Sequence, residues 1–171
     1  MATIKEQKEA DQRREKFRHS EEGVKAALES GEDLFQALLA LADQYRDEST
    51  GYVFSNEKEQ QGGLRRSLRL YAVGCTLLLD LRIPFTNSIQ GSDHHPNAHV
   101  NVRFSDGVIR KGRSYYDRPV IKRDTVWEYD VDGRGNEGWK PPKGDTLISP
   151  DALAVSILTD FVEFVETNRT W

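Results

Sequence analysis

The apolar residues between positions 20 and 48 recur at the spacing of an amphipathic helix. The clearest repeat, with intervals of three and four residues, consists of Leu34, Leu38, Leu41 and Tyr45. This period predicts a helix with one apolar face. Ser30 stands three positions before Asp33, an arrangement similar to a capping box, so we expect one helix to end and a second to begin near Ser30.

Residues 149–166 show the same period together with a clear start signal. Ser149 is a good N-cap residue, and Pro150 suits the first position of a helix. The apolar residues that would share one face are Leu153, Ile157, Leu158, Phe161, Phe164 and Val165. We expect a C-terminal helix whose apolar face is covered by a sheet or by other helices.

The apolar segment 62–85, GGLRRSLRLYAVGCTLLLDLRIPF, is compatible with either a core helix or a pair of buried strands. The spacing of Leu64, Leu68, Tyr71, Cys75 and Leu78 favours the helix, although Gly74 would cost it about 1 kcal/mol relative to alanine. We therefore expect a helix that ends before Pro84. Three arginines would lie away from its apolar face: Arg65, Arg66 and Arg69.

After Pro96 the period changes from helical to alternating. Val100, Val102 and Phe104 would lie on one face of a strand, with His99 and Arg103 on the other. The Asp-Gly pair at 106–107 is typical of a hairpin turn, so 108–116 should be the returning strand. A further alternating run covers 125–131, with a short additional strand possible at 120–122.

The order of these elements predicts an α+β fold. We expect N-terminal helices, an antiparallel sheet of three to four strands over about 98–131, and a C-terminal helix packed on that sheet. Residues 1–18 are charged and have almost no apolar face, so they should form an arm that precedes a single globular domain, 19–171.

Charge is distributed unevenly along the 171 residues, whose net charge is −4. Residues 98–123 hold seven Lys and Arg against two Asp and Glu, whereas 124–151 hold three against seven. The acidic segments could fold over the basic one and neutralise it, or the basic segment could form a surface of its own.

The single cysteine, Cys75, cannot form a disulfide within the chain, and its position among apolar residues indicates a core thiol. No segment resembles a signal peptide or a membrane-spanning helix. We therefore expect an intracellular, cytoplasmic protein.

Asp93, His94, His95 and His99 are the candidate metal ligands, because imidazole and carboxylate groups suit zinc and related ions. The stretch Asp-His-His-Pro at 93–96 resembles the metal-binding region of HNH nucleases, in which a histidine activates water. In that family a helix with a second metal ligand follows the hairpin, whereas further strands follow here. A metal-dependent hydrolase or nuclease is one alternative function.

The function we expect is binding, because the sequence contains no catalytic constellation and no cofactor motif. The chain would act as an accessory, inhibitor-like or immunity-like domain that recognises a protein partner through a basic sheet surface. The residues we expect on this surface are Arg103, Arg110, Lys111, Arg113, Asn101 and Tyr115, together with Arg65, Arg66 and Arg69. A nucleic-acid-binding module using the same residues is the other alternative.

Overall fold

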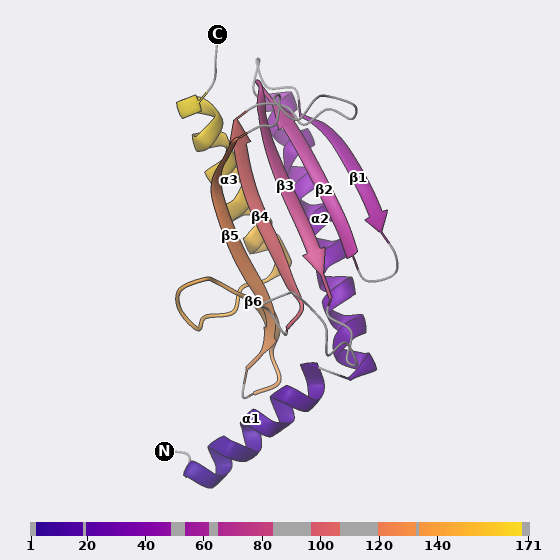
Figure 1. Ribbon diagram of the computed structural model, residues 1–171, viewed down its shortest axis with the longest axis vertical. Helices are drawn as coiled ribbons and strands as arrows, with labels where there is room; N and C mark the ends of the chain where they lie inside the picture. Colours follow the sequence, from indigo (N-terminus) through magenta and orange to yellow (C-terminus); the bar gives the residue numbers. More distant parts are fainter. Residues whose placement is uncertain are drawn as a thin grey trace.

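The computed structural model describes residues 3–18, 20–48, 54–61, 65–83, 97–106, 120–132 and 134–168 (Figure 1). Its helices and strands are α1 (Ile4–Arg18), α2 (Glu21–Glu48), β1 (Ser55–Gln61), β2 (Arg65–Ala72), β3 (Cys75–Arg82), β4 (His99–Asp106), β5 (Val120–Val131), β6 (Glu137–Lys140) and α3 (Pro150–Asn168). This order confirms the predicted α+β class, with helices first, then an antiparallel sheet, then a C-terminal helix.

The strands form one six-stranded antiparallel sheet in which each strand pairs with the next along the chain. In Figure 1 both α2 and α3 lie behind this sheet, so they cover the same face. The sheet is larger than predicted, because it begins at β1 rather than near residue 98. β5 joins the two runs expected at 120–122 and 125–131 into one strand, while the expected strand 108–116 lies outside the described residues.

The hydrophobic core fills the space between the sheet and the two long helices. α2 contributes Leu34 and Leu38, which are fully buried, and α3 buries the whole apolar face expected from the sequence. Phe104 of β4 lies 5.5 Å from the ring centroids of both Phe161 and Phe164 of α3. The apolar faces of α2 and α3 therefore pack against each other and against the same face of the sheet.

The helix predicted in segment 62–85, ending before Pro84, is wrong, because the described residues 65–82 form the hairpin of β2 and β3. Val73 and Gly74 have φ angles of 48° and 77°, as a two-residue type I′ hairpin turn requires. Buried residues alternate along β2, whereas β3 buries apolar residues at alternate positions and also Thr76 and Asp80 between them. The intervals of four and three residues imitate a helix because they combine two faces: Leu68 and Cys75 lie on the core face, and Tyr71 and Leu78 lie on the other.

The helix boundary predicted at Ser30 is also wrong, because α2 runs without interruption from Glu21 to Glu48. The Ser30 hydroxyl does not cap a helix; its oxygen accepts a hydrogen bond of 3.0 Å from Nε1 of Trp139 in β6. The neighbouring Gly31 allows α2 to approach the sheet, since a Cβ atom there would lie 2.4 Å from a methyl group of Leu81. Both residues therefore serve the packing of helix on sheet.

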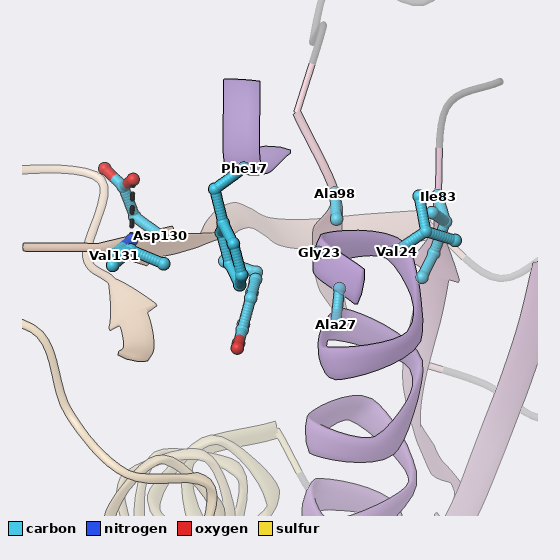
Figure 2. A pocket seen from close by; sticks show the side chains of 9 residues that line it. Phe17, Gly23, Val24, Ala27, Ile83, Ala98, Asp130 and Val131 are labelled. Carbon is cyan, nitrogen blue, oxygen red and sulfur yellow. Dashed lines mark hydrogen bonds between the residues drawn. The ribbon is translucent and has the colours of Figure 1, made fainter. Parts of the chain in front are cut away.

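α1 contacts the rest of the molecule through its C-terminal end. Phe17 lies over a small cavity of about 10 Å³, roughly the space of one water molecule, between α2 and the strands (Figure 2). Arg14 donates a 2.8 Å hydrogen bond from Nε to the carbonyl oxygen of Val131. Gly23 of α2 allows the close crossing of the two helices, because a Cβ atom there would lie 1.9 Å from the carbonyl oxygen of Phe17.

Glu32 of α2 connects the helix layer to the β1–β2 edge of the sheet. Its two carboxylate oxygens pair with Nη1 of Arg66 at 2.6 Å and with Nζ of Lys58 at 2.8 Å. Burial alone would raise the pKa of Glu32, but the hydrogen bonds and charges of Lys58 and Arg66 outweigh it and hold the pKa below the usual value of a glutamate. Arg66 therefore lies on the helix-covered face and not on the expected interaction surface.

We expect Glu32→Gln to lower the free energy of unfolding by about 1 kcal/mol at neutral pH. A carboxyl group with a lowered pKa in the folded state stabilises the protein above its unfolded pKa and loses that effect as the pH falls through the folded pKa. The difference in free energy of unfolding between the wild type and Glu32→Gln should therefore become smaller as the pH is lowered from 6 to below 4. Urea unfolding across this range measures it, and a constant difference would contradict the assignment.

Candidate interaction surface

Alternate residues of β2 to β5 point away from α2 and α3 and form what we call the open face. No helix of the described ranges covers this face, which is turned toward the reader in Figure 1. Its polar residues are Arg65, Ser67, Arg69, Tyr71, Thr76, Asp80, Arg82, His99, Asn101, Arg103, Ser105, Asp124 and Glu128, of which Thr76, Asp80, His99 and Ser105 are buried. Antiparallel sheets commonly leave one face open in this way, and the arrangement of charges decides what such a face can bind.

Asp80 organises the part of the open face formed by β2 and β3. Only 5% of its side chain is exposed, against 47% for Arg65 and 33% for Arg82. Its carboxylate accepts hydrogen bonds of 3.2 Å from Nε and Nη2 of Arg65 and of 3.1 Å from Nε of Arg82. We call these two residues, which are paired across the strands, the Asp80 arginine pair. The buried carboxylate holds both guanidinium groups in place while leaving part of each exposed.

The neighbouring cation on the open face is also paired within the molecule. Nε of Arg103 lies 3.4 Å from a carboxylate oxygen of Asp124 on β5. Glu128 adds another acidic residue two positions further along β5. The expected basic surface is therefore a mixed one in its described part, where arginines alternate with carboxylates of adjacent strands.

Asn101 lies beside Asp80 on the open face, since the two residues are paired in the β3–β4 register. Its side-chain oxygen is buried and accepts no hydrogen bond from the described part of the chain. A buried acceptor without a donor is rare in native structures. The centre of the open face therefore contains a buried acceptor that the described residues leave without a donor.

The structure brings some of the predicted surface residues together and separates others. Arg65, Arg69, Asn101 and Arg103 share the open face, whereas Arg66 faces α2. The other expected residues lie outside the described ranges: Arg110, Lys111, Arg113 and Tyr115.

Sequence reasoning missed Asp80 and Arg82. The signal was a lone acidic residue within the apolar stretch LLLDLR at 77–82, which reads as a buried carboxylate only once the segment is recognised as a strand.

His99 was expected on an exposed strand face, but it is only 4% exposed. Its Nδ1 atom lies 2.9 Å from the carbonyl oxygen of Asn97. The other candidate ligands, Asp93, His94 and His95, lie outside the described residues. Within the described ranges, no group of three or more His, Cys, Asp or Glu side chains is placed to hold a metal ion.

Cys75 is buried in the core, as expected from its apolar neighbours. Burial raises the pKa of its thiol, and the charge of Asp106 raises it further. A buried thiol with a raised pKa is a poor nucleophile, so this cysteine serves packing.

Comparison of the chain with protein-family models, with curated proteins and with solved structures found no match. Among the described residues, no helix combines the length and the apolar character needed to cross a membrane. The functional interpretation therefore depends on the geometry of the open face.

Proposed function

We propose that this chain is an intracellular binding or accessory domain, inhibitor-like or immunity-like, that recognises a protein partner through the open face of its sheet. The observation that carries the proposal is the Asp80 arginine pair. Arginine is enriched at protein interfaces and among the residues that dominate binding energy. Side chains already held in position lose less conformational entropy on binding, and Asp80 supplies that restraint.

The mixture of charges on the open face favours a protein partner over a nucleic acid. A phosphate backbone is best neutralised by cations at intervals, without acidic residues between them. Here Asp80, Asp124 and Glu128 stand among the arginines. Complementary patterns of both signs are what distinguish one protein partner from another.

Affinity isolation from the native cells, followed by measurement of Kd with the purified partner, tests this proposal. We expect Arg65→Ala combined with Arg103→Ala to weaken binding about tenfold or more, since hydrogen bonds to charged groups contribute about 1.5–3 kcal/mol each. Lys25→Ala combined with Lys143→Ala is the matched control, because it makes the same change in charge at exposed positions off the open face. The control should bind as the wild type does.

Two results would contradict the proposal. One is the absence of any protein partner above background; the other is equal affinity of the open-face variant and the wild type. Recovery of nucleic acid whose affinity falls steeply with added salt would instead support the alternative of a nucleic-acid-binding module.

A further inference from the structure

A cleft of about 310 Å³ lies between α1 and the turn that joins β5 to β6. It uses no residue of the open face. Three arginines line it, Arg13 and Arg14 from α1 and Arg134 from the turn, and Phe17 and Val131 supply apolar surface. An anionic ligand with an apolar neighbouring group matches this lining.

Two of these arginines, Arg13 and Arg134, differ from those of the open face in donating no hydrogen bond to a carboxylate of the described residues. Arg13 donates from Nε only to the carbonyl oxygen of Glu9, at 3.3 Å. Arg134 forms no salt bridge with a carboxylate of the described residues, but its charge adds to the hydrogen bonds from Asn136 in lowering the pKa of the nearby Asp132. Both arginines are exposed at the surface. Their guanidinium groups can therefore donate hydrogen bonds to a ligand without first giving up a carboxylate.

The third arginine fixes the geometry of the cleft. Nε of Arg14 donates to the carbonyl oxygen of Val131 at 2.8 Å, and its Nη1 lies 3.5 Å from a carboxylate oxygen of Asp11. Arg14 thereby joins α1 to the end of β5 and keeps the two walls of the cleft at a set separation.

Asp132 limits how much negative charge the cleft can accept. Its carboxylate accepts hydrogen bonds from the backbone N–H groups of Arg134 at 2.8 Å and Asn136 at 2.9 Å, and from the Asn136 side chain at 3.0 Å. It is thus retained by the turn as an ionised neighbour. A singly charged carboxylate ligand meets less repulsion from it than a doubly charged phosphate does.

We propose that this cleft binds an acidic peptide segment of a protein partner, with one carboxylate between Arg13 and Arg134 and an adjacent apolar side chain on Phe17 and Val131. Binding would bridge α1 and the β5–β6 turn and so hold α1 against the sheet. The proposal does not depend on the open face, since the two surfaces share no residue.

Fluorescence anisotropy of the full chain at low salt, with a labelled peptide that carries one glutamate next to a phenylalanine, tests the proposal. We expect saturable binding in the wild type and a loss of about tenfold or more in affinity for Arg13→Glu combined with Arg134→Glu. Lys5→Glu combined with Lys8→Glu is the control, because it makes the same change in charge on exposed positions of α1 outside the cleft. Circular dichroism establishes that both variants fold.

Hydrogen exchange supplies a second readout, since the peptide should slow exchange of amides in α1 and in the turn at 132–136. Equal weakening by both pairs of substitutions, or no saturable binding by the wild type, would overturn the proposal. Inorganic phosphate displacing the peptide at lower concentration than acetate would overturn the carboxylate assignment. Loss of peptide binding only in the Arg65 and Arg103 variant would move the site to the open face and leave the proposed function standing.

Discussion

Replacing Arg65 and Arg82 together by methionine is expected to lower the free energy of unfolding by about 3–5 kcal/mol. The methionine side chains still shield Asp80 from solvent, but they supply none of the hydrogen bonds that the arginines donate to its carboxylate. An ionised carboxylate that is 5% exposed and has lost its partners is strongly destabilising. Chemical denaturation at neutral pH measures the loss.

Adding Asp80→Leu to that double variant should restore most of the lost stability, because no buried charge then remains. Arg103→Met is the single-site control; its partner Asp124 is 48% exposed, so we expect a loss below about 1 kcal/mol. If the third substitution makes the protein still less stable, the carboxylate is not the source of the effect and the interpretation of the Asp80 arginine pair is wrong.

The other large effect is expected at Trp139, where Trp139→Ala should cost about 3–5 kcal/mol. The side chain is fully buried, packs edge-to-face on Tyr129 with ring centroids 5.5 Å apart, and donates its indole N–H to Ser30. Alanine leaves a cavity at the junction of β6 and α2. Guanidinium unfolding followed by circular dichroism measures the change.

Trp139→Phe separates the ring from the hydrogen bond. Phenylalanine retains most of the packing. Ser30→Ala should lower the free energy of unfolding less in the Trp139→Phe variant than in the wild type, because both substitutions remove the same hydrogen bond between Trp139 and Ser30. Val155→Ala is the control, since Val155 is an exposed apolar residue of α3 and its change should stay within about 0.5 kcal/mol. A cost below about 1 kcal/mol for Trp139→Ala would contradict its place in the core.

The open face and the arginine cleft differ in how their cations are held. On the open face, Arg65, Arg82 and Arg103 are paired with carboxylates of the protein itself, so a partner would have to match a pattern of both signs. In the cleft, Arg13 and Arg134 form no salt bridge with a described carboxylate, and Arg134 has only the charge of the nearby Asp132 beside it. The two surfaces should therefore respond differently to salt, with the cleft more sensitive.

The candidate surface could be predicted only in part, and the reason is visible in one segment. Arg65, Arg66 and Arg69 were placed on one side of a helix, but residues of a strand alternate between faces. Arg66 therefore joins Glu32 on the helix-covered face, while Arg65 and Arg69 lie on the open face. Assuming a helical period for this one segment assigned residues of two sheet faces to a single surface, and it left Asp80 unrecognised as a buried carboxylate.

The sequence by itself determined the α+β class, the apolar faces of α2 and α3, and the alternation along β4, because each depends on the spacing of residues close together in the chain. Only the tertiary structure decided that segment 65–82 is a hairpin, that α2 continues through Ser30 and that Asp80 lies beneath two arginines. These features depend on partners from other elements, such as Trp139 for Ser30 and β4 for β3. Local spacing does not encode which distant partner satisfies a hydrogen bond or covers an apolar strand.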